Sequence, residues 1–358
     1  MSQYVDDYNQ YTADTQLRVG AGAEHGGKAL YAATELPAGT ELLEELPLVA
    51  WPTAATSTAG GFCDACLAVS DSLASCACGC GAHFCDSARC TDGVVHRILC
   101  HGGGLLALRK WQVDSFGGSQ YGVESVARCN ARIATDVAYF CSLGLPADAA
   151  LINAQRPFER LCAFPPDCEL ALGGGRTAAE VAQVLRKHTR RGLLSELCTR
   201  LPATEAEPIA DALLSAPHVA GLLQRLLLNS LQTKPCAAAS GDELRFAGIF
   251  LVTACANHSC APNVAVEATD ECSLRLRTTA RVERGDELRI SYVDTTLPCC
   301  ERRRLLAHWA IDECECARCR DEVEGLAEAP AEGPVVAGTA KPLAERDGLD
   351  RTSKRQKK

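Results

Sequence analysis

Long apolar runs are missing from this sequence: no stretch of about 18 or more uncharged apolar residues occurs in its 358 residues. We therefore expect no transmembrane helix and no membrane partner. The N-terminal residues, which include Asp6, Asp7 and Asp14, have neither the basic nor the apolar part of a signal peptide, and this predicts a chain that is not exported.

Positive charge is also scarce, because 36 Lys and Arg residues stand against 45 Asp and Glu residues and give a formal net charge of -9. This balance argues against strong nonspecific binding to nucleic acid, and we expect no specific nucleic-acid partner. It suits a basic partner, although plain solubility explains it equally well. We expect a monomer located in the nucleus and/or the cytoplasm.

Cysteine, in contrast, is abundant, with 22 residues. In a chain that is not exported these are expected to be thiols and metal ligands rather than disulfides. The hydrophobic content of 47% and charged content of 23% are those of a globular protein, and the length allows two or three domains.

Residues 63–100 hold the densest cysteine cluster. Cys63-x2-Cys66 places two thiolates on one tight turn, as zinc knuckles do. The nine candidate ligands in this span are Cys63, Cys66, Cys76, Cys78, Cys80, Cys85, Cys90, His96 and Cys100, with His83 as a possible substitute. Eight ligands hold two tetrahedral zinc ions, and a span with few large apolar residues needs metal to fold. The alternative is a set of buried free thiols.

The pattern along the chain alternates between strands and helices. Strands are expected at 28–33 and 41–51, and again between 246 and 293. Residues 53–61 resemble a linker. Helical periodicity marks 105–231, including Glu180–Leu194 and a helix opened by Pro217, and it returns at Glu301–Trp309. After Glu324 the composition predicts a disordered tail. These features indicate an α+β enzyme with inserts.

Three motifs follow one another in the C-terminal third of the chain. They are Asn257-His258-Ser259-Cys260-Ala261-Pro262-Asn263, then Gly285-Asp286-Glu287-Leu288-Arg289-Ile290-Ser291-Tyr292, then Cys314-x-Cys316-x2-Cys319. Together with Gly27-Lys28-Ala29-Leu30-Tyr31-Ala32 and the inserted cysteine cluster, they resemble the SMYD family of SET and MYND domain lysine methyltransferases, in a short form close to related plant and algal SET proteins. In that family the position that corresponds to Ala29 is usually occupied by glycine.

The resemblance implies a SET fold, with small twisted β-sheets and a knot-like crossing. It implies this division of the chain: 1–55, N-terminal part of SET; 60–101, MYND-like zinc finger; 102–245, helical insert; 246–296, C-terminal part of SET; 297–320, post-SET zinc segment; 321–358, disordered tail.

The resemblance also groups the metal ligands into about three zinc sites. The first is Cys63, Cys66, Cys85 and Cys90. The second is Cys80, His96 and Cys100 with either Cys76 or Cys78. The third joins Cys260 to Cys314, Cys316 and Cys319, which alone supply only three of the four thiolates that a structural zinc needs.

For the reaction site the resemblance implies S-adenosylmethionine as cofactor. The expected cofactor-binding residues are Lys28, Leu30, Tyr31, Asn229, Asn257 and His258. Tyr292 is the expected catalytic residue, and Trp309 the expected aromatic of the substrate channel. Each has a plainer alternative: Tyr292 as an ordinary strand aromatic, Asn257 as a turn residue, Trp309 as a core residue.

The sequence therefore predicts a protein-lysine N-methyltransferase whose partner is a protein carrying a target lysine, with a histone tail as one option. Proline-rich peptides are the partners expected at a MYND finger. The alternative is an interaction module with an inactive SET core. The substrate and the number of methyl groups added stay open.

Overall fold

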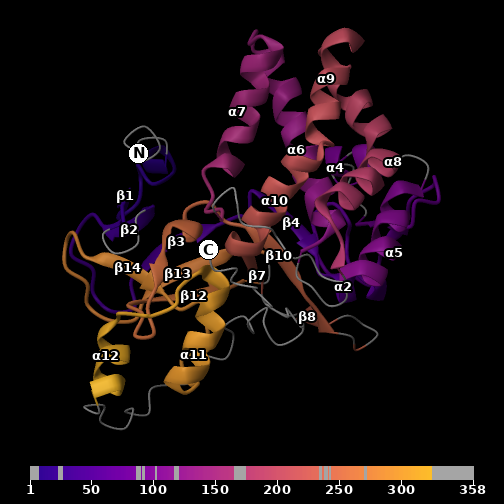
Figure 1. Ribbon diagram of the computed structural model, residues 1–358. Helices are drawn as coiled ribbons and strands as arrows, with labels where there is room; N and C mark the ends of the chain where they lie inside the picture. Colours follow the sequence, from indigo (N-terminus) through magenta and orange to yellow (C-terminus); the bar gives the residue numbers. More distant parts are fainter. Residues whose placement is uncertain are drawn as a thin grey trace, which may run out of the picture.

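The structure is a computed structural model that describes residues 8–22, 27–85, 90, 93–100, 103–116, 121–164, 175–233, 236–237, 241, 243–269 and 272–324. Helices gather in one lobe and small sheets in the other, with α11 (Cys299–Leu306) and α12 (Ala317–Glu324) at the far end of the sheet lobe (Figure 1). The α+β class is as predicted from the sequence. Among the described residues no helix is both long and apolar enough to cross a membrane. Of the predicted disordered tail 321–358, residues 321–324 are part of helix α12, and the rest lies outside the described residues.

Three small sheets form the second lobe. One has the order β1-β2-β14-β11, another β4-β10-β7 and the third β12-β13-β3. The strands are β1 (Leu17–Ala21), β2 (Lys28–Ala32), β3 (Glu41–Glu45), β4 (Val49–Pro52), β7 (Ser230–Gln232), β10 (Phe246–Ile249), β11 (Asn257–His258), β12 (Val264–Ala268), β13 (Leu274–Thr278) and β14 (Glu287–Ile290). Two-residue pairs β5 (Ala74–Ser75) with β6 (His83–Phe84) and β8 (Cys236–Ala237) with β9 (Glu243–Leu244) complete the set.

The crossing is the place in the sheet lobe where β11 and β14 lie side by side in a parallel pairing. Strand β11 pairs parallel with β14, with Asn257 opposite Arg289 and His258 opposite Ile290. Strand β14 pairs antiparallel with β2, where Leu288 lies opposite Leu30. Segments that lie more than two hundred residues apart in sequence thus become neighbours in one sheet.

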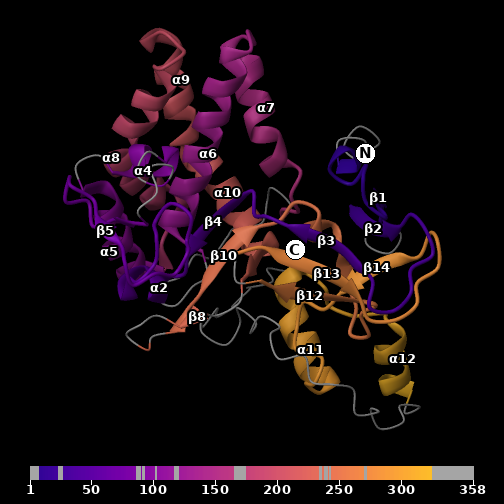
Figure 2. The same ribbon diagram turned by 180° about the vertical axis from the view of Figure 1, so that it is seen from behind.

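Seven helices of the described chain build the other lobe. They are α4 (Val94–Leu99), α5 (Gly104–Phe116), α6 (Val123–Ser142), α7 (Ala147–Glu159), α8 (Ala178–Leu197), α9 (Ala203–Leu213) and α10 (Ala216–Asn229). Helix α6 is at the centre and packs against α4, α5, α7 and α8, an arrangement seen from both sides (Figure 2). The polypeptide then returns to the sheet lobe through β7, which directly follows α10.

Local sequence signals explain two of these helices. Helix α8 starts with a capping box, in which the Thr177 hydroxyl accepts from the Glu180 amide and the Glu180 carboxylate accepts from the Thr177 amide at 2.8 Å. Helix α10 starts at the N-cap Ser215 with Pro217 in its first turn, as the sequence predicts. At Gly192 a Cβ would lie 1.9 Å from the carbonyl oxygen of Ile98, so glycine is needed where α4 approaches α8.

The structure differs from the sequence expectation in two places. Residues 53–61 are not a plain linker, because they contain helix α2 (Ala54–Ala59), capped by Thr53 and packed against α5. The segment 102–245 is not helical to its end, since β7, β8 and β9 follow Asn229. Helix α2 consists of small residues and therefore shows no apolar periodicity in the sequence. Strands β7, β8 and β9 have only two or three residues each, too few to show the alternation of apolar and polar residues that predicts a strand.

A buried group of four charges joins the finger to the helices. Asp64, from the loop between Cys63 and Cys66, pairs with Arg109 of α5. Arg109 Nε lies 2.9 Å from Glu124 Oε2, and Arg128 NH2 lies 2.9 Å from Glu124 Oε1. All four side chains are buried. Two carboxylates and two guanidiniums balance in charge, which is what makes burial tolerable.

We predict that Glu124→Gln lowers the free energy of unfolding by about 3–5 kcal/mol, because it leaves two buried guanidiniums with one carboxylate between them. Chemical denaturation at pH 7 measures this. Asp136→Asn on the same helix is the matched control: its pair with Arg132 is partly exposed, so a change of at most about 1 kcal/mol is expected. Equal effects of the two changes would contradict the role given to the buried group.

The same carboxylate makes stability sensitive to acid. Burial alone would raise the pKa of Glu124, but Arg109 and Arg128 more than offset burial and hold the pKa below the ordinary value of 4.5. A carboxyl group whose pKa is lower in the folded than in the unfolded state stabilises the fold at pH values above its unfolded-state pKa. This stabilisation is lost as the pH falls through the folded-state pKa. The wild type should therefore lose stability below pH 4.5 more steeply than Glu124→Gln.

Candidate functional site

The first cysteine cluster brings together Cys63, Cys66, Cys85 and Cys90, as expected from the sequence. The knuckle turn is closed by the Leu67 amide, which donates to the Cys63 carbonyl at 2.8 Å. The Sγ atoms of Cys66 and Cys85 are 3.9 Å apart, and those of Cys85 and Cys90 are 3.2 Å apart. Four convergent thiols are a donor set that suits a structural zinc.

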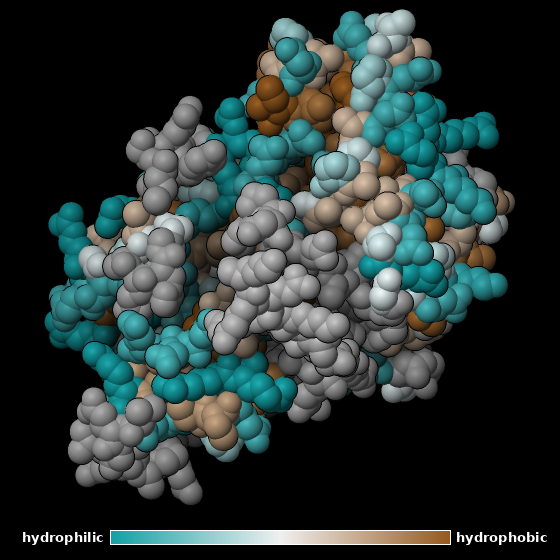
Figure 3. Space-filling view, in the orientation of Figure 1, coloured by the Kyte–Doolittle hydropathy of each residue, from teal (hydrophilic) through white to brown (hydrophobic). Residues whose placement is uncertain are grey.

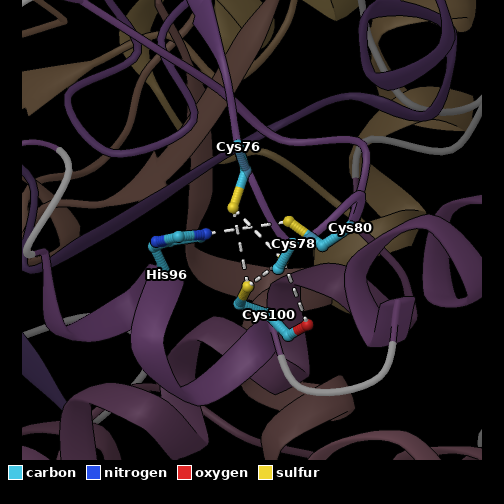
Figure 4. A group of neighbouring side chains, drawn as sticks. All are labelled: Cys76, Cys78, Cys80, His96 and Cys100. Atoms are coloured by element: carbon cyan, nitrogen blue, oxygen red, sulfur yellow. Dashed lines mark hydrogen bonds between the residues drawn. The ribbon is translucent and has the colours of Figure 1, made fainter.

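The second cluster has five members: Cys76, Cys78, Cys80, His96 and Cys100 (Figure 4). Helix α4 carries His96, and Cys100 directly follows that helix. Both Cys76 and Cys78 lie within reach of the shared centre, so proximity alone leaves the choice between them open. The possible substitute His83 belongs to neither cluster of the described finger and lies on β6.

The third cluster joins Cys260 to Cys314, Cys316 and Cys319, all of them buried. Its Cys260 Sγ lies 3.9 Å from that of Cys314 and 3.5 Å from that of Cys319. The buried Arg302 of α11 (Cys299–Leu306) places NH2 3.5 Å from Cys319 Sγ, where its positive charge suits a group of thiolates. One ion here would fasten the C-terminal segment to the motif loop that also holds Asn257 and His258.

Helix α12 (Ala317–Glu324) strengthens the same connection. Its Arg318 donates to the carbonyl of Cys260 at 3.3 Å and to that of Thr295 at 2.7 Å. Glu322 accepts from both Arg318 and Arg302, at 2.7 and 2.6 Å. The two C-terminal helices are therefore held to the crossing by hydrogen bonds as well as by the cysteines.

Asn257 lies at the crossing itself. Its Nδ2 donates to the backbone oxygen of Lys28 at 3.2 Å and to Glu287 Oε1 at 2.8 Å, so it ties β11 to β2 and β14. Asn263, from the same motif, adds two bonds to β14: its Nδ2 donates to the Glu287 carbonyl at 2.9 Å, and its Oδ1 accepts from the Arg289 amide at 2.8 Å.

His258 links the crossing to Tyr292. The Tyr292 amide donates to His258 Nδ1 at 3.0 Å, and the two rings lie 5.4 Å apart. Burial lowers the pKa of His258 to about 4, so the ring is neutral at pH 7. A neutral ring is what the observed bond requires, because only an unprotonated Nδ1 can accept.

Tyr292 and Trp309 form an aromatic pair beside that histidine. Their ring centroids are 5.3 Å apart, and the Tyr292 hydroxyl donates to the Ala256 carbonyl at 2.9 Å. Burial raises the pKa of Tyr292 well above its ordinary value, which keeps the phenol protonated. Trp309 is half-buried on the short helix η4 (Ala307–Trp309) and donates from Nε1 to the Leu228 carbonyl at 3.2 Å.

Asn229 is the last residue of α10 and directly follows Leu228, whose carbonyl accepts from Trp309. Its amide is engaged by main chain: Nδ2 donates to the carbonyls of Cys162 and Arg225, both at 2.8 Å, and Oδ1 accepts from the Cys162 amide at 3.2 Å. The structure brings the rings of Trp309, Tyr292 and His258 together, with Asn257 next to His258 on β11 and Asn229 next to Leu228, whose carbonyl accepts from Trp309. Asn229 also clamps the loop at Cys162.

The three residues predicted on β2 are divided between its two faces. Lys28 Nζ donates to the Tyr8 hydroxyl at 2.8 Å and to the Arg160 carbonyl, and Leu30 is fully buried. Tyr31 points the other way: its hydroxyl donates to the Ala21 carbonyl at 2.6 Å and Arg18 lies over its ring. The structure therefore does not bring the Tyr31 ring together with Tyr292.

The alanine that replaces the family glycine at position 29 is not strained. Ala29 is buried within β2 and has no positive φ, unlike Gly27 with a φ of 86°. The backbone at position 29 therefore does not require glycine.

Two polar residues at the site were not predicted from the sequence. Tyr8 is 1% exposed and its ring lies 4.3 Å from Lys28 Nζ. Glu45 accepts from the amides of Val252 and Thr253, both at 2.8 Å, and so fixes the segment just before the crossing. Neither lies in a recognisable motif. Asn263 did have a signal, because it closes the Asn257–Asn263 string.

Comparison with known proteins agrees with this geometry. The SET domain family model matches residues 27–293. SmydA-8 isoform A of Drosophila melanogaster, a SET domain-containing protein, is 24% identical over 306 residues, which cover 83% of this chain and 55% of that protein. A SET and MYND domain-containing protein of Dictyostelium discoideum is 33% identical over 95 residues, 26% of each chain.

The protein-lysine N-trimethyltransferase SMYD5 of Mus musculus is 33% identical over 102 residues, 25% of this chain and 23% of that protein. The chain thus spans only about a quarter to about half of the length of these three relatives. The family resemblance inferred from the sequence motifs is confirmed: this chain, matched over residues 27–293, belongs to the SET-domain family.

Proposed function

We propose that this protein transfers methyl groups from S-adenosylmethionine to the side-chain amine of lysine in a protein substrate. The observation that carries the proposal is the grouping of Tyr292, His258 and Trp309 at the crossing, within a chain matched to the SET domain. The names of relatives such as SMYD5 support lysine methylation in general. Which protein is modified, a histone or another, is left to experiment.

The residues around the crossing suit the cofactor. Both hydrogen-bond acceptors of the Lys28 ammonium are neutral, a phenol and a carbonyl, so this cation can also take the carboxylate of an amino-acid moiety. Lys28, Asn257 and His258 would hold the cofactor on this side, with Asn229 and the Cys162 backbone nearby. When bound, S-adenosylmethionine supplies an electrophilic methyl group on a sulfonium.

The chain's own residues have three tasks in the reaction. The lysine amine must be neutral to attack, and the half-buried aromatic surfaces of Tyr292 and Trp309 disfavour its charged form. The amine must also be aligned for an in-line displacement, which the Tyr292 hydroxyl and the Ala256 carbonyl are placed to do. The raised pKa of Tyr292 suits a neutral phenol that orients groups rather than a phenolate base.

The proposed zinc ions have a structural task. The donor sets of the three clusters are thiolates with one imidazole, which is zinc chemistry. Such thiols need a reducing compartment, and on this ground we propose the nucleus and/or the cytoplasm. A proline-rich peptide remains the proposed partner of the finger.

The experiment that tests the proposal incubates the full chain with radiolabelled S-adenosylmethionine and a panel of histones and cell lysates. Labelled protein, with mass spectrometry placing the methyl groups on lysine, is the expected result. Cofactor binding without any labelled product would favour the alternative of an interaction module with an inactive core.

Tyr292→Phe should reduce kcat by roughly 100-fold while the thermal midpoint and the cofactor affinity stay close to wild type, because only the orienting hydroxyl is removed. Tyr139→Phe, on the exposed surface of α6, is the matched control and should turn over as wild type. If Tyr292→Phe also turns over as wild type, the catalytic assignment is wrong.

Asn257→Ala should weaken S-adenosylmethionine binding and destabilise the fold. It removes a partner of the Lys28 carbonyl and of a Glu287 oxygen, and because both bonds are only partly buried, the cost should lie near the lower end of about 1–3 kcal/mol for each group. Calorimetric titration and thermal melting measure the two effects. Asn153→Ala on α7, whose Nδ2 bonds only within its own helix, is the control and should leave cofactor affinity unchanged. Unchanged affinity in Asn257→Ala as well would remove Asn257 from the binding site.

Elemental analysis should find about three zinc ions per chain, one for each cluster. Cys314→Ser should lower the count to about two and leave the finger protected from hydrogen exchange. Chelation of all metal should expose residues 63–100 and also weaken cofactor binding, because Cys260 shares the loop of Asn257 and His258. A wild-type count of about one would contradict the finger assignment.

A further inference from the structure

The second cluster offers one donor more than a tetrahedral zinc can use. Cys76 and Cys80 flank one turn of the finger, His96 lies on α4 and Cys100 directly follows that helix, while Cys78 lies in the turn between Cys76 and Cys80 (Figure 4). A structural zinc takes four ligands, so one of the five side chains is left over.

The distances between the donor atoms point to Cys78 as the side chain that is left over. With zinc–sulfur bonds of about 2.3 Å, two thiolates on one tetrahedral ion lie about 3.8 Å apart. Cys76 and Cys100 fit this edge with Sγ atoms 3.7 Å apart, and Cys80 Sγ lies 3.7 Å from His96 Nε2. Cys78 does not fit this edge, since its Sγ lies only 2.6 Å from that of Cys100, much closer than two thiolates on one ion. Its 3.2 Å distance to Cys76 does not decide the matter, because Cys85 and Cys90 of the first cluster are equally close. These spacings favour Cys76, Cys80, His96 and Cys100 as the ligands.

We propose that Cys78 is the reactive, non-ligand thiol of this zinc site, and that a peroxide oxidises it to a disulfide with Cys100, which releases the zinc. The proposal rests on the zinc content proposed above for the finger and does not depend on methyl transfer. Cys78 is exposed, so a small oxidant reaches it, and the sulfur nearest to it belongs to Cys100.

The chemistry balances with hydrogen peroxide as the oxidant. The Cys78 thiol attacks one peroxide oxygen and becomes a sulfenic acid, and the O–O bond breaks with the release of one water. The Cys100 thiolate then attacks the Cys78 sulfur, forming the S–S bond, and the sulfenic oxygen leaves with a proton as a second water. Two electrons pass from the two sulfurs to the peroxide.

The Cys78–Cys100 disulfide would remove Cys100 from the zinc ligands. Cys100 directly follows α4, which carries the second ligand His96 and packs against α6 and α8. With Cys100 in a disulfide, three donors are left for the ion, so its affinity falls. The first and third clusters contain no fifth donor within the same distance among the described residues, and their zinc should be held through the same treatment.

The test uses the zinc-loaded full chain, hydrogen peroxide and a chromogenic zinc chelator. Wild type should release about one zinc per chain in an early phase, and peptide mass spectrometry should find a Cys78–Cys100 disulfide. Cys78→Ser should still carry about three zinc ions and release the early one about tenfold more slowly. Cys198→Ser, which removes an exposed thiol at the end of α8, is the matched control and should behave as wild type.

Four results would overturn the proposal. A Cys78→Ser protein with about two zinc ions would show that Cys78 is a ligand. Early release at the wild-type rate in Cys78→Ser, or a disulfide that joins other cysteines, would show that Cys78 is not the reactive thiol. Wild type with about one zinc would contradict the metal assignment of the finger and this proposal with it, whereas a full zinc count with unchanged release contradicts the proposal alone.

Discussion

The site depends on the parallel pairing of β11 with β14, because Asn257, His258 and Tyr292 are positioned by it. Asn257 and His258 form β11, Tyr292 follows β14 by two residues, and the Tyr292 amide bonds back to His258. Cys260, two residues beyond His258, leads to the third cysteine cluster. A two-residue strand has little stability alone, so the crossing relies on the side-chain bonds of Asn257 and Asn263 and on the C-terminal helices.

The sequence predicted those parts of the site that local chemistry dictates. The spacing of Cys63 and Cys66 indicated a shared metal ion, and these two cysteines lie together with Cys85 and Cys90. The apolar periodicity of Glu180–Leu194 marked α8, although the capping box at Thr177 starts the helix two residues earlier. The strings at Asn257 and Tyr292 marked the crossing through a family resemblance, since nothing in a lone asparagine or tyrosine indicates which strand it will meet.

The remainder depends on contacts between distant segments, which have no local signal. Tyr8 meets Lys28 only because β1 folds back on β2. Asn229 is a predicted cofactor-binding residue, and its amide also clamps the loop at Cys162, a partner 67 residues away that no local pattern indicates. Tyr31 turns towards β1 for a similar reason: the face of a strand is set by its neighbours, and a motif does not record those.

Hydrophobic residues are exposed on the outer part of the helical lobe, around α7 (Figure 3). The inner part of this lobe is tied to the finger, because Asp64 of the finger shares its charge balance with Arg109, Glu124 and Arg128 of the helices. A finger transplanted into another protein would bring one buried carboxylate and leave two arginines behind. Evolution can therefore exchange the finger and the helical insert as one inherited block, but exchanging either alone would require compensating charge substitutions in the other.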